Sequence, residues 1–236
     1  MSLLSVENVS KRYRRGIRER IALQDVSFAV EPGELVAVLG PRKCGRSTLL
    51  RTAAGLERPD QGVVRFDGES ILNGRDVVGR RVCYCRTSFS PMEGEHMVDH
   101  VAAALLAQGV PASRAKREAE VALARTAVAE CARMHPDELS GPERVRVALA
   151  RGLVAHPKLL VADDPVSGVA FTQRDGILRL LRSIANEGVA VLMSTDDATC
   201  ISGADRVFAL DDGRLRIDVH APQAEVVPLR PQHALG

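Results

Sequence analysis

The sequence has no long apolar run and no strong excess of one charge. No stretch of its 236 residues approaches 18 consecutive apolar side chains, so it predicts no segment that spans a bilayer. Its 32 basic and 30 acidic side chains leave a formal charge of +2, whereas a general binder of nucleic acid or of anionic membranes usually has a basic excess. We therefore expect a globular protein without a nucleic-acid partner. A chain of this length can bury about 70% of its unfolded surface.

Cysteines with the CxxC spacing of metal sites are also missing. The five cysteines are an odd number, and Cys83 and Cys85 form a lone CxC without a second cluster or a matching His pair. A structural zinc site takes four ligands, typically from two pairs, so we expect no cysteine–zinc centre. An odd number of cysteines without paired spacing is typical of a protein in a reducing compartment. The N-terminal residues carry Glu7 and no charged-then-apolar pattern, so no secretion signal is expected.

Lysine is scarce as well. Arginine supplies 28 of the 32 basic side chains, and lysine supplies the other four, Lys11, Lys43, Lys116 and Lys158. A general preference of the genome for arginine is the simplest explanation. Under such a preference, mutation readily replaces a lysine by arginine, including a lysine within a functional motif.

The first third of the chain predicts strands and the start of a βαβ unit. Residues 3–9 and 21–30 alternate as strands do, and the basic run at 11–20 is predicted to be a solvated hairpin loop between them. The apolar run at 35–40 predicts a strand buried on both faces. A glycine-bounded loop and a helical pattern from residue 47 follow it.

The remainder predicts a helical insertion in an α/β core. Segments 98–108 and 113–133 are rich in alanine and read as helices, so we place the insertion at about 88–140. Helical and apolar strand patterns then alternate up to a closing hairpin at 205–217. The chain therefore predicts one domain over residues 1–220, followed by a poorly ordered tail at 221–236.

Residues 40–48, GPRKCGRST, match the P-loop pattern at Gly40, Gly45 and Ser47. Glycines let backbone amides curl round phosphate oxygens, and the following helix directs its positive dipole end at them. The lysine position of the pattern holds Arg46, whose planar fork does not replace a compact ammonium between phosphates. Lys43 offers a partial substitute, and a purely structural glycine turn is the alternative interpretation.

Three separated segments extend this match and resemble the ATP-binding subunits of ABC transporters. They are the strand, P-loop and hairpin at 35–68, the signature helix and Walker B strand at 138–168, and the closing strand pair at 201–215. The resemblance runs from about Ser2 to Arg216. It implies a P-loop NTPase-type parallel sheet with an N-terminal antiparallel β subdomain and an inserted α-helical subdomain. The N-terminal segment looks most like subunits of lipoprotein or macrolide export systems.

The resemblance also implies a sandwich dimer with two ATP molecules, each between the P-loop of one subunit and the signature motif of the other. Tyr13 matches the aromatic residue that stacks on adenine, with a surface hairpin tyrosine as the alternative. Ser47 and Asp163 match the residues that hold Mg²⁺. The nucleotide-binding loop would comprise Gly40, Pro41, Arg42, Lys43, Cys44, Gly45, Arg46, Ser47 and Thr48, and the signature Ser140, Gly141, Pro142 and Glu143.

Several positions depart from the family pattern where the chemistry takes place. Asp164 stands at the glutamate that polarises the attacking water, Thr87 at the Q-loop glutamine, and Asp196 at the switch histidine. The D-loop aspartate and the Gly and Gln of the signature are replaced by Ala170, Pro142 and Glu143. Loss of a positioned acid or base lowers a rate by about 10²–10⁴-fold, and loss of a preorganised donor by about 10²–10³-fold.

The resemblance and its departures together predict a transporter subunit that binds ATP and Mg²⁺ weakly and hydrolyses ATP slowly or not at all. A nucleotide-free scaffold or regulatory protein is one alternative, and an active but slow ATPase that drives export is another. The implied partners are a transmembrane permease and a second ABC subunit, identical or different. The implied location is the cytoplasmic face of the cell membrane. Residues 88–110 lie where the family contacts its permease, and the candidate contacts, which core packing would explain equally well, are Phe89, Pro91, Met92 and Met97.

Overall fold

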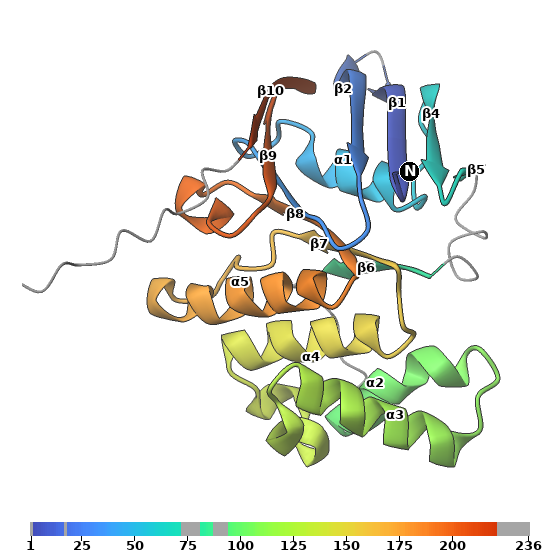
Figure 1. Ribbon diagram of the computed structural model, residues 1–236, viewed down its shortest axis with the longest axis vertical. Helices are drawn as coiled ribbons and strands as arrows, with labels where there is room; N and C mark the ends of the chain where they lie inside the picture. Colours follow the sequence, from blue (N-terminus) through green and yellow to red (C-terminus); the bar gives the residue numbers. More distant parts are fainter. Residues whose placement is uncertain (1, 17, 72–80, 87–93, 221–236) are drawn as a thin grey trace, which may run out of the picture.

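Helix α1 (Arg46–Ala53) packs between two β-sheets (Figure 1). The structure, a computed structural model, describes residues 2–16, 18–71, 81–86 and 94–220. Leu49 and Leu50 of α1 are fully buried, and their core includes apolar residues of both sheets. The helix that follows the glycine loop is therefore anchored on two sides, which fixes the position of the loop.

The first sheet is antiparallel, with the strand order β2-β1-β4-β5. Its strands are β1 (Leu4–Arg15), β2 (Arg18–Val30), β4 (Gln61–Phe66) and β5 (Glu69–Ser70). The prediction of a solvated loop over residues 11–20 is wrong, because both strands continue through most of this run. Opposite charges support the pairing: Glu19 lies 3.5 Å from Arg14 and 3.8 Å from Arg12.

The second sheet has six strands in the order β10-β9-β3-β8-β7-β6, and only β10 runs antiparallel to its neighbour. The strands are β3 (Leu35–Leu39), β6 (Val82–Arg86), β7 (Leu159–Asp163), β8 (Ala190–Thr195), β9 (Arg206–Asp211) and β10 (Arg214–His220). The predicted buried strands β3, β7 and β8 are confirmed, since nearly all their residues are buried. Strand β6 has no counterpart among the strands predicted from the sequence.

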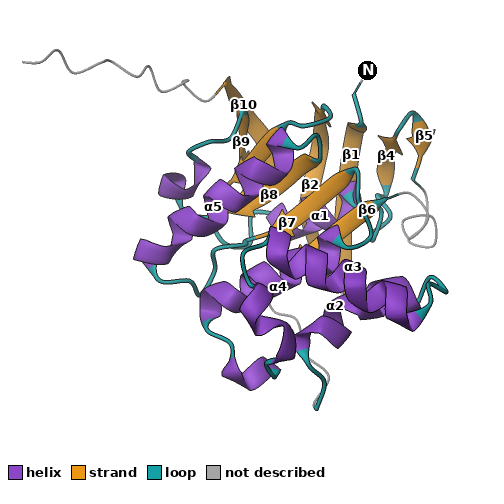
Figure 2. Cartoon of the chain, turned by 60° about the horizontal axis from the view of Figure 1, so that its bottom comes forward, coloured by secondary structure: helices purple, strands orange, loops and turns teal. Residues whose placement is uncertain are grey.

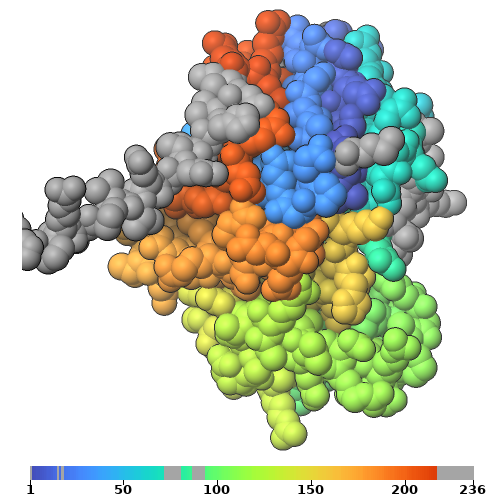
Figure 3. All heavy atoms as spheres, in the orientation of Figure 1, coloured from blue at the N-terminus to red at the C-terminus, as the bar shows by residue number. Residues whose placement is uncertain are grey.

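Helices α4 (Gly141–Leu153) and α5 (Phe171–Asn186) cover the other face of this sheet (Figure 2). On the far side of α4 lie α2 (Met97–Leu106) and α3 (Ala112–Arg125), which share a third core with it. The space-filling view shows these helices as a lobe beside the sheets (Figure 3). The predicted α/β fold class with its β and helical subdomains is thereby confirmed.

The helix predicted over 113–133 is too long. Helix α3 ends at Arg125, and a short 3-10 segment, Ala129–Arg133, follows. The Thr126 hydroxyl donates to the carbonyls of Ala122 and Leu123 at 3.3 and 3.2 Å, and Ala127 adopts a φ of 57°. A threonine that bonds the preceding turn and a left-handed residue after it end the helix there.

Helix α2 begins with Met97, which is fully buried in the helical core rather than exposed to a partner. Phe89, Pro91, Met92 and the predicted tail at 221–236 lie outside the described residues. In the described part of the chain, no helix is both long enough and apolar enough to cross a membrane.

Candidate functional site

The carboxyl ends of neighbouring parallel strands bring most of the predicted site residues to one edge of the six-stranded sheet. Gly40 follows β3, Asp163 ends β7 and Asp196 follows β8. Asp163 lies opposite Ser194 of β8 in the register, so the strands end level with one another. Ligands of open α/β sheets bind at this edge.

The two glycines of the loop are required by close contacts with neighbouring strands. A Cβ at Gly40 would overlap the carbonyl oxygen of Leu210 in β9, and a Cβ at Gly45 would overlap that of Ala22 in β2. Gly45 also has a φ of 115°, which L side chains rarely adopt. The loop is thus a tight turn held between two strands from different sheets.

Backbone hydrogen bonds hold the loop in place as well. The Gly213 amide, in the β9–β10 turn, donates to the Cys44 carbonyl at 2.8 Å, and the Gly213 carbonyl accepts from the Gln24 amide at 2.8 Å. The Leu49 amide donates to Gly45 at 2.8 Å and closes the first turn of α1. The Cys44 thiol is buried, which raises its pKa and leaves it uncharged.

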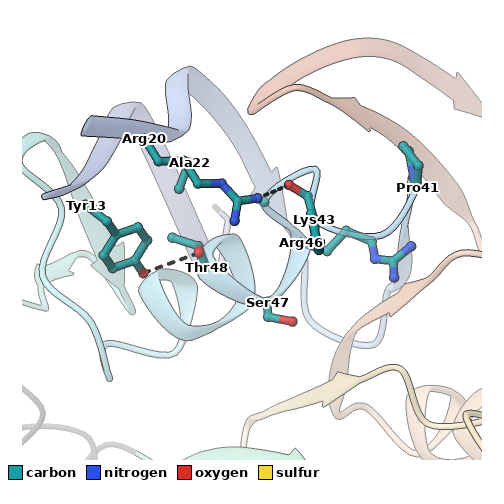
Figure 4. Close-up of a pocket in the computed structure, with 9 residues that line it drawn as sticks. Tyr13, Arg20, Ala22, Pro41, Lys43, Arg46, Ser47 and Thr48 are labelled. Atoms are coloured by element: carbon teal, nitrogen blue, oxygen red, sulfur yellow. Dashed lines mark hydrogen bonds between the residues drawn. The ribbon is translucent and has the colours of Figure 1, made fainter. Parts of the chain in front are cut away.

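A cleft of about 200 Å³ opens over this loop and the start of α1 (Figure 4). Its walls come from strands β1 and β2 of the antiparallel sheet, from the loop and from the first turn of α1. The lining residues are Tyr13, Arg20, Ala22, Pro41, Lys43, Gly45, Arg46, Ser47 and Thr48. The cleft therefore contains most of the nucleotide-binding residues predicted from the sequence.

Three cationic side chains lie in the cleft, and two of them donate to the loop itself. The Arg46 guanidinium donates to the Gly40 carbonyl, and only 9% of this residue is exposed. Arg20, on β2, donates to the Lys43 carbonyl (Figure 4). Lys43 has a φ of 68° and an exposed side chain. The structure thus satisfies the charge at the P-loop lysine position with a backbone carbonyl.

Tyr13 lies at the end of the cleft away from Pro41 (Figure 4). Its hydroxyl donates to Glu57 and lies 3.3 Å from the Thr48 hydroxyl and 3.3 Å from the Arg51 guanidinium. The residue is 38% exposed. Its hydroxyl is held while its ring borders the cleft, an orientation that suits stacking on a base, and that role stays a prediction.

Both carboxylate oxygens of Asp163 accept hydrogen bonds. The Tyr84 hydroxyl, on β6, donates to Oδ2 at 2.8 Å, and the Ser194 hydroxyl donates to Oδ1 at 2.8 Å. Burial raises the pKa of Tyr84, and the neighbouring Asp163 raises it further, so the phenol keeps its proton and stays a donor. These two neighbours fix the orientation of the carboxylate.

Asp164 follows in a left-handed conformation with a φ of 52°. Its amide donates to the Ser194 hydroxyl at 3.0 Å. Burial raises the pKa of its carboxyl, and the negative charges of Asp196 and Asp163 raise it further. Asp196 forms an ion pair of 3.4 Å with Arg42 of the loop. Two carboxylates that interact electrostatically therefore lie at neighbouring strand ends, one of them paired with the loop.

The predicted signature residues form the first turn of α4. Ser140 is the N-cap, Pro142 is at a position where its missing amide costs no helical hydrogen bond, and Glu143 completes a capping box. The Glu143 carboxylate accepts from the Ser140 amide at 2.7 Å and from the Ser140 hydroxyl at 2.6 Å. These bonds lower the pKa of Glu143 and engage the hydroxyl donor of the motif within its own chain.

The donor set of the cleft fits a phosphate chain with a magnesium ion. Loop amides supply phosphate contacts, and the Ser47 hydroxyl, which hydrogen-bonds to none of the described residues, lines the cleft. Asp163 supplies a carboxylate, a ligand type that Mg²⁺ prefers. The assignments of Ser47 and Asp163 to the metal stay predictions.

The lining of the cleft does not include Asp163, Asp164, Asp196 or the signature residues 140–143. Thr87 lies outside the described residues, and Ala170 is the N-cap of α5 without a capping side chain. Conversely, Arg20, Tyr84 and Ser194 were not predicted from the sequence. The only sequence signal was that Arg20 lies near Tyr13 in the chain, and nothing local marked the other two.

Comparisons with known proteins identify the family. The model of the ABC transporter family matches residues 23–167. The aliphatic sulfonates import ATP-binding protein SsuB of Cupriavidus necator is 38% identical over 221 residues, which cover 91% of this chain and 68% of that protein. The cell division ATP-binding protein FtsE of Escherichia coli is 34% identical over 221 residues, which cover 90% of this chain and 97% of its own.

A third relative, the lipoprotein-releasing system ATP-binding protein LolD of Hyphomonas neptunium, is 34% identical over 219 residues, or 90% of this chain and 96% of its own. Among solved structures, the dimeric bacterial ABC transporter cassette MJ0796 has a TM-score of 0.83 at 25% identity, covering 92% of this chain and 98% of that one. The fold, the order of the motifs and these relatives agree, and the chain belongs to the ABC transporter family as an ATP-binding cassette.

Proposed function

We propose that this cassette serves a membrane transporter, binds ATP and Mg²⁺ weakly, and hydrolyses ATP slowly or not at all. The observation that carries the proposal is the carboxylate pair at the strand ends, where Asp196 helps to raise the pKa of Asp164. The family has a histidine donor at the position of Asp196. An anion there repels a γ-phosphate and donates no hydrogen bond to it.

Different residues of the chain have different roles at the site. Bound Mg²⁺ would neutralise charge on the phosphates. Ser47 and Asp163 would hold the metal, and the loop amides would hold phosphate oxygens. Asp164 has one methylene less than the glutamate of the family, so its carboxylate stands about 1 Å further from the water, and a misplacement of this size lowers a rate by about 10²-fold.

Two further contacts support weak binding. Arg46 has to leave the Gly40 carbonyl before it can reach a phosphate. Ser140 has to leave Glu143 before it can donate to the nucleotide of a partner subunit, and Glu143 would then face the phosphates as an anion. Such losses act on one site and do not multiply.

ABC cassettes of transporters pair with transmembrane permeases and form dimers, and the MJ0796 cassette is dimeric. By the same pattern this chain lies on the cytoplasmic face of the membrane, bound to a permease and to a second cassette, identical or different. The named relatives serve sulfonate import, lipoprotein release and cell division. These roles differ, so they indicate no single cargo.

Calorimetric titration with ATP and Mg²⁺, together with a phosphate-release assay, tests the proposal. We expect turnover well below about 1 s⁻¹, the lower end of the ordinary enzyme range. The double variant with Asp164→Glu and Asp196→His should hydrolyse ATP about 10²-fold faster than the wild type. Wild-type turnover near 1 s⁻¹ that Asp164→Ala abolishes would establish an active ATPase instead, whereas activity that survives Asp164→Ala comes from a contaminant.

A nucleotide-free scaffold is the second candidate. The bond between Arg46 and Gly40 favours it, because this cation is satisfied without any phosphate. No heat of binding and no thermal shift at millimolar ATP would support the scaffold, and a saturable signal that Ser47→Ala reduces would support weak nucleotide binding.

A further inference from the structure

Cys83 and Cys85 place two thiols side by side on strand β6. They are separated by one residue, so both point to the same face of the strand. Their sulfur atoms lie 3.7 Å apart, and both thiols are free. Cys85 is buried and donates to the Ala148 carbonyl of α4 at 3.5 Å, whereas Cys83 is half-buried.

The opposing helix has a glycine against this pair. A Cβ at Gly152 of α4 would lie 2.5 Å from the Cys83 sulfur and 2.8 Å from the Cys85 sulfur. Any larger residue would force the sulfurs away from their present positions. The neighbouring Arg151 provides a positive charge that acts on both thiols.

The two thiols differ in character. The Cys85 thiol can turn from Ala148 to donate to a Cys83 thiolate, which lowers the pKa of Cys83, and the charge of Arg151 lowers it further. The same hydrogen bond and burial raise the pKa of Cys85. A more acidic, more accessible thiol beside a buried one is the arrangement of an attacking cysteine and its resolving partner.

We propose that Cys83 and Cys85 form a redox site that reacts reversibly with a low-molecular-weight disulfide. The Cys83 thiolate attacks one sulfur of the reagent, forms a mixed disulfide and releases one thiolate. Cys85 then loses its proton and attacks the Cys83 sulfur, which forms the protein disulfide and expels the second thiolate. The two protein thiols are oxidised, and the reagent is reduced to two thiols.

The backbone geometry makes this bond a labile one. In an extended strand, Cα atoms two residues apart are separated by about 6.6 Å, near the upper end of the range that a disulfide spans, about 4.4–6.8 Å. The sulfurs must also approach from 3.7 Å to about 2.05 Å. The strand therefore has to contract, and a strained disulfide is readily reduced again, as expected of a sensor in a reducing compartment.

Contraction of this segment acts on the nucleotide site through the residue between the two cysteines. Tyr84 points to the opposite face of β6 and donates to Asp163 at 2.8 Å. Within the described sheet, β6 is an edge strand that pairs with β7 alone. Shortening the distance between residues 83 and 85 turns Tyr84 away from Asp163, so oxidation should weaken the hold on the metal-binding carboxylate. This coupling rests on the proposed function, whereas the redox reaction does not.

The redox step is tested with oxidised glutathione and the full-length protein. Alkylation followed by cleavage after Arg81 and Arg86 releases a five-residue peptide that contains Cys83 and Cys85 and no other cysteine. We expect this peptide to lose two hydrogens and take up no alkylating reagent, and a dithiol reductant to restore it. Cys83→Ser should abolish the change, and Cys200→Ser, which removes another buried thiol, should not. An unchanged peptide, or glutathione that remains on Cys83 without release, would overturn the proposal.

The coupling to Asp163 has its own readout. The chain has no tryptophan and two tyrosines, so Tyr84 is the sole tyrosine in a Tyr13→Phe background. Ultraviolet Raman spectra of this variant report whether the phenol donates a hydrogen bond. Oxidation should reduce that signature in the Tyr13→Phe protein and leave it unchanged when Cys83→Ser is added. An unchanged signature in the oxidised protein would refute the coupling whether or not the protein binds ATP.

Discussion

The Tyr84 hydroxyl donates a hydrogen bond of 2.8 Å to Oδ2 of Asp163, while Ser194 donates to the other carboxylate oxygen. The strands that carry these donors lie on either side of β7, so the aspartate is held from both neighbours in the sheet. Outer contacts of this kind orient metal ligands and tune their affinity.

Replacement of Tyr84 by phenylalanine should therefore lower the affinity for Mg²⁺ in the presence of ATP by about tenfold, because one oxygen of Asp163 loses its hydrogen-bond donor. Titration of ATP binding against Mg²⁺ concentration measures the effect. The matched control is Tyr13→Phe, which removes the other tyrosine hydroxyl of the chain at the far end of the cleft. An equal loss of Mg²⁺ affinity in both variants would contradict a specific role of Tyr84.

The Arg46→Lys variant should bind ATP at least about tenfold more tightly than the wild type, a difference of about 1.4 kcal/mol. A compact ammonium fits between phosphate groups better than the planar guanidinium, which donates to Gly40 in this structure. Calorimetry at fixed Mg²⁺ checks the prediction. Arg42→Lys serves as the control, since its partner is Asp196, and an equal gain there would show that the effect is general electrostatics.

The capping box of α4 should make stability depend on pH. Because hydrogen bonds from Ser140 lower the pKa of Glu143 in the folded state, the Glu143 contribution is fully present above its ordinary pKa of about 4.3 and disappears as pH falls through the folded value. Glu143→Gln should thus destabilise the protein at pH 7 and less at pH 3. Urea unfolding at both pH values measures this, and an equal loss at each would contradict it.

Two glycines within helices should respond to alanine in opposite ways. Gly152→Ala is expected to destabilise the protein by about 1–3 kcal/mol, because the new methyl group meets two sulfurs. Gly176→Ala should stabilise it by about 0.5–1 kcal/mol, because its Cβ would approach only the far end of the long Arg146 side chain at 3.1 Å and helix propensity then dominates. Thermal unfolding compares them, and the same sign for both would be inconsistent with this packing.

The sequence was sufficient to predict the fold class because its strands are marked by apolar runs and its loop by glycines. The hairpin at 11–20 was predicted wrongly, since charged residues give no strand signal until Glu19 is seen beside Arg14. The end of α3 was missed because Thr126 bonds backward to Ala122 and Leu123, which periodicity does not report.

The site was predictable only where its residues share a motif. Gly40, Gly45 and Ser47 are neighbours in the chain and were placed by their spacing. Tyr84 and Ser194 reach Asp163 from other strands, so their roles depend on a sheet order that the sequence does not state. Arg20 enters the cleft because β2 continues further than predicted.

The hydrogen bonds that join Gly213 to Cys44 and Gln24 hold the backbone of the loop in its present shape. The loop backbone is held by contacts with both sheets, so it needs little rearrangement to accept a ligand. Binding therefore costs little conformational entropy of the loop. Every departure from the family pattern described in the cleft is a change of side chain on this fixed backbone. If hydrolysis is slow as proposed, the difference from an efficient ATPase is therefore chemical and not conformational, and substitutions can remove it without refolding the scaffold.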